Sequence, residues 1–218
     1  MGLPEAIDKV SKALAFLRVE RNDGSTGQGT AFVVGADGLL ATAAHLLRDA
    51  LKVEATIVGT KATIRCAIAA SDTASDAALL KAEARDLKPV ALWRGESIAL
   101  GREVAIMGFP HSDIFGDLGG SPLGMTMRGI IGNRYRLGTT EHYVIDVSPS
   151  EGMSGGPVFL SDTGQVVGFV GGRFDPARTR AKMAGRAREE VRALPVERTS
   201  ILFAPSIEYL LALLPQRR

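Results

Sequence analysis

The segment Glu151-Gly152-Met153-Ser154-Gly155-Gly156-Pro157 places a serine among glycines and decides how this 218-residue chain is interpreted. An oxyanion hole made of backbone N–H groups needs a tight turn whose amides converge on one point, and glycine allows the chain to make it. Ser154 is therefore the candidate nucleophile. The oxyanion hole is expected at Gly152, Met153 and Ser154, with the amides of Gly152 and Ser154 as donors.

The order of the histidines narrows the choice of fold. Residues 152–156 also match the Gly-x-Ser-x-Gly turn of α/β-hydrolases, in which the catalytic histidine follows the serine. The histidines of this chain, His45, His111 and His142, all precede Ser154, so that interpretation is excluded. His45 ends the apolar run 39–44 and is the candidate general base, whereas His111 and His142 are expected to be structural or exposed.

A catalytic triad also needs a carboxylate held against the imidazole. Asp76 immediately precedes the apolar run 77–80, which would carry the backbone into a packed sheet and leave the carboxylate at its edge. We expect the acid to be Asp76, with Asp72 as the alternative.

Together these segments resemble the chymotrypsin-fold (trypsin-like) serine peptidases, and most closely the HtrA/Deg branch. The catalytic blocks that carry the resemblance are Gly29–Val34, Thr42–His45, Asp76–Leu80 and Gly152–Pro157, and supporting segments in the same order are Gly101–Pro110, Gly164–Phe169 and Phe203–Pro205. Met153 departs from the asparagine common before the nucleophile in HtrA proteins. No PDZ-like domain is expected after the peptidase, because the sequence ends soon after Phe203.

The resemblance implies an all-β fold of two six-stranded antiparallel β-barrels with N-terminal and C-terminal helices. Short apolar segments at regular spacing support it, and the Asp37-Gly38 pair between two of them predicts a hairpin. We expect a single trypsin-like peptidase domain over residues 1–218. Its expected parts are a helix at 3–17, a first barrel at about 18–95, a second barrel at about 96–206, an inserted helix at about 178–194 and a C-terminal helix at about 205–214.

The first of these helices is predicted from the spacing of Ile7, Val10, Leu14 and Leu17. The inserted helix lies within Arg173–Arg198, which holds eight basic and four acidic residues. Because the segment follows the expected wall of the specificity pocket, it is a candidate gate for substrate or a binding site for an activating protein partner. A solvated surface helix explains the same charges equally well.

The predicted function is that of a serine endopeptidase acting through a Ser-His-Asp triad and an acyl-enzyme. In this fold the pocket floor lies about six residues before the nucleophile, at Ser148, and further substrate-binding residues are expected at Phe169, Val170 and Gly171. Because Ser148 supplies no carboxylate, cleavage is expected after small or medium apolar residues, although Asp146 lies near. The alternative is a latent protease effector or binding module whose site is ordered only by a partner.

Bulk composition sets wider limits. A formal net charge of +2 with 45% hydrophobic residues describes an ordinary globular chain, so neither a nucleic-acid nor a membrane partner is expected. The partner that the peptidase resemblance implies is a protein or peptide substrate. Three dispersed histidines and one cysteine give no metal-ligand spacing, and no cofactor is expected. Cys66 cannot form an intramolecular disulfide and the N-terminal segment lacks a continuous apolar run, so a cytoplasmic location is expected if Met1 is the native start.

Overall fold

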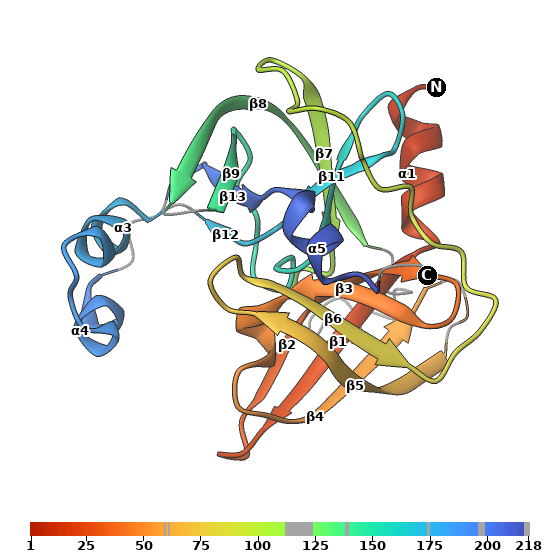
Figure 1. Cartoon of the computed structure of the whole chain (residues 1–218), viewed down its shortest axis with the longest axis horizontal. Coiled ribbons are helices and arrows are strands. Elements are labelled where there is room, and N and C mark those ends of the chain that lie inside the picture. The colour runs from red at the N-terminus through yellow and green to blue at the C-terminus, as the bar shows by residue number, and fades with distance from the viewer. Residues whose placement is uncertain are drawn as a thin grey trace.

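The computed structural model describes residues 1–58, 60, 62–111, 124–137, 140–173, 175–195 and 199–215. It confirms the all-β prediction, because two antiparallel β units make up most of the described chain (Figure 1). The glycines at 116, 119 and 120 and Pro122 predict a loop, and these positions lie outside the described residues.

The first unit is a closed barrel in which each strand pairs with two neighbours, in the order β1-β2-β3-β6-β5-β4. Its strands are β1 Leu14–Arg21, β2 Thr26–Gly35, β3 Leu39–Ala43, β4 Ala50–Ile57, β5 Ala62–Asp72 and β6 Ala77–Ala82. The predicted hairpin at Asp37-Gly38 joins β2 to β3, and Gly38 has a φ of 92°. A Cβ there would meet the Ala82 carbonyl oxygen at 2.2 Å, so this turn requires glycine.

The N-terminal helix is shorter than the sequence predicts. Helix α1 spans Leu3–Ser11, and Leu14 and Leu17 belong to β1 instead. The helical spacing of the apolar residues continues into β1, but this strand pairs with both β2 and β4 and thereby closes the barrel. Tertiary pairing overrides the local pattern here, and the first barrel begins at Leu14 rather than near residue 18.

The second unit is a strongly curved sheet in the order β11-β10-β7-β8-β9-β13-β12. Its strands are β7 Glu103–Gly108, β8 Met125–Leu137, β9 Thr140–Ile145, β10 Pro157–Leu160, β11 Val166–Phe169, β12 Gly172–Arg173 and β13 Leu202–Pro205. Strand β10 lies between β11 and β7, and its Val158 pairs with Ile106 of β7. The segment that holds Ser154 leads directly into β10, so it joins the sheet at an inner strand and not at an edge.

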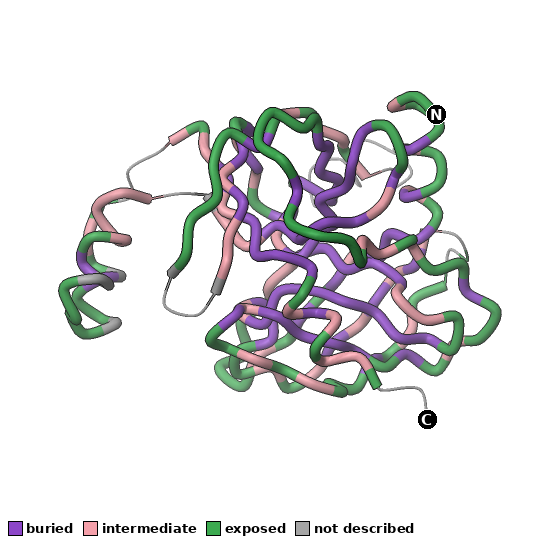
Figure 2. Tube along the Cα trace, turned by 45° about the horizontal axis from the view of Figure 1, so that its top comes forward, coloured by how far each residue is buried: buried purple, intermediate pink, exposed green. Residues whose placement is uncertain are grey.

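The predicted single inserted helix is two short helices, α3 Pro176–Met183 and α4 Arg188–Ala193. Gly185, with a φ of 70°, lies between them, and a glycine in the left-handed region is a common end to a helix. Both helices project away from the two β units, as Figure 1 shows, and Figure 2 shows that they lie apart from the main buried core.

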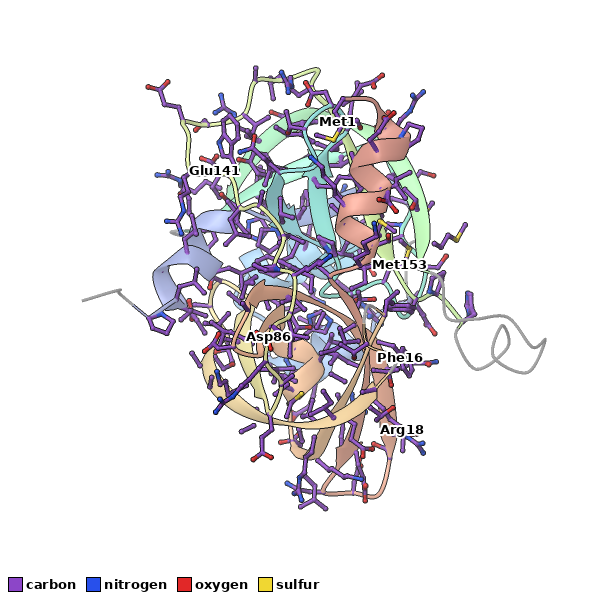
Figure 3. The ribbon with its side chains drawn as sticks, turned by 90° about the vertical axis from the view of Figure 1, so that its right-hand side faces the viewer. Met1, Phe16, Arg18, Asp86, Glu141 and Met153 are labelled. Atoms are coloured by element: carbon purple, nitrogen blue, oxygen red, sulfur yellow. The ribbon has the colours of Figure 1, made fainter. Side chains whose placement is uncertain are left out.

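The C-terminal helix α5 spans Ile207–Leu213 and begins where the Ser206 hydroxyl accepts a hydrogen bond from the Glu208 amide. It packs between the β units, because Ile207 and Leu210 belong to the same buried cluster as Phe159 of β10 and Leu79 of β6. A second buried cluster lies within the second β unit and contains Met153. In Figure 3, Met153 lies at the level where the two units meet.

Candidate active site

His45 and Asp76 meet where two neighbouring strands of the first barrel end. His45 lies in the 3-10 turn η1, Ala44–Leu47, directly after β3, and Asp76 directly precedes β6. Ala43 and Ala77 are paired across these strands, so Ala44 lies opposite Asp76, and His45 follows Ala44 at the start of η1. The His45 Nδ1 atom lies 2.8 Å from Asp76 Oδ2, and the His45 backbone N–H donates to Asp76 Oδ1 at 2.8 Å.

The backbone of Asp76 is also held. Its φ of 58° is in the left-handed region, which aspartate tolerates better than most residues, and its carbonyl accepts a hydrogen bond from the Ala44 amide at 2.8 Å. The side chains of His45 and Asp76 are 33% and 27% exposed, so the imidazole keeps an accessible edge. A carboxylate on Nδ1 leaves Nε2 as the nitrogen available for proton transfer.

Asp72 has a different environment. Its carboxylate accepts hydrogen bonds from the Ser75 hydroxyl at 2.5 Å and from the Ala74 amide at 2.9 Å. These hydrogen bonds, first that of the Ser75 hydroxyl, lower the pKa of Asp72. The structure thus places Asp76, and not Asp72, against His45.

The chain before Ser154 forms a tight turn over residues 150–153. The Met153 amide donates to the Ser150 carbonyl at 3.2 Å, and Gly152, the third residue, has a φ of 91°. A positive φ at this position is typical of a type II turn. A Cβ on Gly152 would meet the Phe109 carbonyl oxygen at 2.2 Å, so the turn needs glycine for space as well as for conformation.

The orientation of the central peptide in this turn is fixed by His111. The His111 amide donates to the Glu151 carbonyl at 3.4 Å. Because the peptide bond is trans, the N–H of Gly152 points away from that carbonyl and from His111. The predicted oxyanion donor is therefore held in one orientation by a main-chain contact.

Within the described part of the chain, the N–H groups of Gly152 and Ser154 donate to no protein acceptor, whereas that of Met153 closes the turn. Met153 is a predicted oxyanion residue, but its amide is occupied and its side chain is completely buried. The two remaining amides, those of Gly152 and Ser154, are separated by Met153. They are the two amides that the sequence predicts as donors to the oxyanion.

Ser154 lies at the junction of the two β units and close to the residues before His45. The Thr30 amide of β2 donates to the Ser154 carbonyl at 2.8 Å. At the next residue, a Cβ on Gly155 would meet Thr42 Oγ1 at 2.3 Å and the Ala43 nitrogen at 3.0 Å. Residues 150–155, here called the nucleophile turn, are thus packed against the end of β3, immediately before the 3-10 turn that carries His45.

The predicted substrate-binding residues differ in their accessibility. Phe169 and Val170 are completely buried, in different apolar clusters, so the structure gives neither side chain a face toward a substrate. Ser148 and Gly171 are half-buried. The carboxylate of Asp146 accepts the Ile130 amide at 2.5 Å and so is bound to β8.

Three contributions to the site were not predicted from the sequence. The amides of Thr30 and His111 hold the nucleophile turn, and Val170 holds it through its backbone, because its carbonyl accepts from the Gly155 amide at 2.7 Å. Main-chain contacts of this kind carry no residue-type signature. Thr30 alone leaves a trace in the sequence, as the polar residue directly before the apolar run 31–34 of β2.

The remaining candidate groups lie elsewhere. His142 is on β9, with its ring 6.0 Å from that of Phe203. Cys66 is buried in the first barrel, and burial raises the pKa of its thiol to about 11. The described residues contain no group of three or more His, Cys, Asp and Glu side chains suited to a metal ion, and none of their helices has the length and apolarity to cross a membrane.

Sequence comparison finds relatives among bacterial endoproteases. The chain is 32% identical over 145 residues to a probable periplasmic serine endoprotease DegP-like of Pseudomonas fulva, which covers 65% of this chain and 28% of the relative. It is 32% identical over 149 residues to the protein of the same name in Hahella chejuensis, covering 66% and 29%. The chain thus spans less than a third of the length of these curated relatives.

Solved structures show the same fold. The HtrA-type protease AlgW with tripeptide superposes with a TM-score of 0.75 at 21% identity, covering 97% of this chain and 62% of that one. The serine endoprotease from Yersinia pestis gives a TM-score of 0.71 at 19% identity, covering 97% and 65%.

The expected cytoplasmic location is wrong on this comparison, because the curated relatives are named as periplasmic proteins. The physical reason is that a single cysteine forms no intramolecular disulfide in any compartment, so it carries little information about location.

The model of the trypsin-like peptidase domain matches residues 29–169, a segment that contains His45, Asp76 and Ser154 and more than half of the chain. The chain belongs to the trypsin-like peptidase family.

Proposed function

We propose that this protein is a serine endopeptidase in which Ser154 is the nucleophile, His45 the general base and Asp76 the residue that orients the imidazole. The observation that carries the proposal is the Asp76–His45 pair, with Nδ1 and Oδ2 2.8 Å apart, beside a serine turn with two unoccupied amides. The DegP-like and HtrA-type relatives support the same activity.

The proposed reaction follows from the roles of these groups. His45 Nε2 takes the Ser154 hydroxyl proton as the oxygen attacks the substrate carbonyl, and Asp76 stabilises the resulting imidazolium. The amides of Gly152 and Ser154 bind the developing oxyanion. His45 then protonates the leaving amine, and water, deprotonated by the same imidazole, hydrolyses the acyl-enzyme.

The proposed preference is for small or medium apolar residues before the scissile bond. It is supported by the lack of a carboxylate at Ser148 and by the contact of Asp146 with the Ile130 amide, which directs that carboxylate to β8. The buried side chains of Phe169 and Val170 do not support the preference, so it rests on the polar groups.

We also propose that any activating protein partner binds the α3–α4 segment, which stands away from the two β units and follows β12 directly. The latent-effector alternative is less well supported, because the turn that presents Gly152 is already closed by the Met153 amide in the chain alone. The named location of the relatives supports a periplasmic site of action.

The experiment that tests the function is covalent labelling with a fluorophosphonate probe, read by intact mass, for the wild type and for Ser154→Ala. We expect one adduct on the wild type and none on the variant. A folded wild type that forms no adduct would contradict the constitutive peptidase and favour the latent effector. Labelling of both proteins would contradict the choice of Ser154.

A further inference from the structure

Thr30 occupies an unusual position for a buried threonine. It lies in β2 of the first barrel and is completely buried. Its hydroxyl donates to the Gly152 carbonyl at 2.7 Å and accepts from the Phe109 amide at 3.1 Å. The single proton of the hydroxyl is thus committed to the nucleophile turn, across 122 residues of sequence.

The backbone of Thr30 contacts the same turn. Its amide donates to the Ser154 carbonyl at 2.8 Å, and its own carbonyl accepts from the Thr42 hydroxyl at 2.7 Å. One residue of the first barrel therefore binds the carbonyls of both Gly152 and Ser154, which are the two residues whose amides are the proposed oxyanion donors.

The peptide groups of this turn explain what the hydroxyl adds. The Gly152 N–H belongs to the peptide plane that His111 holds, and the Ser154 N–H belongs to a plane whose carbonyl, that of Met153, accepts from the Gly156 amide at 3.0 Å. The plane between them contains the Gly152 carbonyl, which Thr30 binds, and the Met153 N–H, which donates to the Ser150 carbonyl. Consecutive peptide planes are joined at Cα atoms. Rotation of this middle plane would therefore change the angle between the N–H groups of Gly152 and Ser154.

The surroundings leave little room for a substitute contact. A Cβ on Gly108 would meet the Met153 Cα at 2.8 Å and Thr30 Oγ1 at 2.9 Å, so the hydroxyl lies in a packed space between the two β units. Removing it would leave the Gly152 carbonyl and the Phe109 amide buried without this partner.

We propose that the Thr30 hydroxyl is a positioning residue for catalysis, which sets the relative orientation of the Gly152 and Ser154 amides and ties the oxyanion hole to the first barrel. This inference rests on the proposed peptidase function. Thr30 touches no substrate. Its loss acts through the turn, so transition-state binding weakens and ground-state binding does not.

The test compares Thr30→Val, which has the same shape without the hydroxyl, with Thr30→Ser, which keeps it. The matched control is Ser206→Ala, which also removes a buried hydroxyl but one that caps α5, outside the turn. For each protein kcat and KM are measured separately on a peptide substrate, with the fluorophosphonate labelling rate and the thermal unfolding midpoint alongside.

We expect Thr30→Val to lower kcat by about 10- to 100-fold, somewhat less than direct loss of an oxyanion donor, and to change KM by less than about threefold. Thr30→Ser should keep kcat near the wild type. Ser206→Ala should lower the unfolding midpoint but retain kcat. Thr30→Ala, which adds no atom to the site, replaces Thr30→Val if that variant does not fold.

A folded Thr30→Val with wild-type kcat would overturn the inference, as would a Thr30→Ser that is equally impaired or a Ser206→Ala with the same loss of kcat. A wild type as unreactive as Ser154→Ala would instead overturn the proposed function, and the role of Thr30 with it. The two failures are therefore distinguishable.

Discussion

Asp76 binds His45 through both carboxylate oxygens, one on the imidazole Nδ1 and one on the backbone amide, each at 2.8 Å. The second contact fixes the backbone position of His45, and the first fixes the rotation of its ring. Aspartate is suited to both because it also tolerates the φ of 58° at this position.

Asp76→Asn is expected to fold and to lose nearly all activity. Asparagine tolerates the same backbone conformation and its carbonyl oxygen can still accept from the His45 amide, but an NH2 group facing Nδ1 favours the wrong tautomer. Such a change in a triad lowers kcat about 10⁴-fold. Steady-state kinetics on a peptide substrate, with circular dichroism as a check of folding, measures the effect.

Asp72→Asn is the matched control for this experiment. Its carboxylate binds Ser75 and Ala74, so we expect activity within a few-fold of the wild type and only a modest loss of stability. If Asp72→Asn were inert and Asp76→Asn active, the assignment of the acid would be reversed.

Gly152→Ala is expected to disrupt the nucleophile turn. Its φ of 91° places alanine in an unfavourable region, and the new Cβ would lie 2.2 Å from the Phe109 carbonyl oxygen. The left-handed conformation alone costs about 1–2 kcal/mol. The backbone clash must add to this, and the turn must shift, so kcat/KM should fall about 10²-fold or more.

Gly101→Ala separates the cost of the left-handed backbone conformation from the cost of the clash with Phe109. Gly101 has a similar φ of 80°, but nothing lies within 4 Å of the position that its Cβ would occupy. Urea unfolding should show a loss of stability from conformation alone, with kcat/KM unchanged. Equal losses in the two variants would mean that the contact with Phe109 has no consequence.

The proposed catalytic residues could be picked out from the sequence because each lies beside a local pattern that the fold then uses. His45 and Asp76 both stand next to an apolar run, and the pairing of β3 with β6 brings those ends together. The contact of Thr30 with Gly152 could not be predicted in the same way, because it joins residues far apart in sequence through a backbone carbonyl that every residue possesses.

The local errors have a similar origin. The periodicity that predicted a helix through Leu17 is real as far as Ser11, but β1 gains partners on both sides and continues the chain as a strand. Phe169 and Val170 were assigned to the specificity pocket from their position in the chain, and that assignment stays a prediction. Their side chains lie in two different buried clusters, which a position in the chain does not reveal.

Cys66 is expected to react slowly with thiol reagents in the native protein. Burial raises its pKa from the ordinary 9.0 to about 11, so its thiolate fraction at pH 8 is about 100-fold lower than in the unfolded chain. Mass spectrometry after a timed pulse of iodoacetamide, with and without urea, measures the difference. Rapid native labelling would mean that the first barrel opens readily.

The same pKa shift affects stability. Between about pH 9 and pH 11 the folded protein keeps the thiol proton that the unfolded chain has lost, so the free energy of unfolding falls as the pH rises through this window. The Cys66→Ala variant lacks this contribution. Its urea midpoint should therefore depend less steeply on pH than that of the wild type.

Ser148→Asp is expected to add cleavage after lysine and arginine. A carboxylate at the pocket floor attracts a basic side chain, as in trypsin, and the wild type has no such group because the Asp146 carboxylate is bound to the Ile130 amide. Profiling with a peptide library should show apolar preference in the wild type and a new basic component in the variant. Ser148→Asn, which has nearly the same size without the charge, should leave the profile apolar. A wild-type profile dominated by lysine or arginine would contradict the proposed specificity, and an unchanged profile in Ser148→Asp would mean that Ser148 does not form the pocket floor.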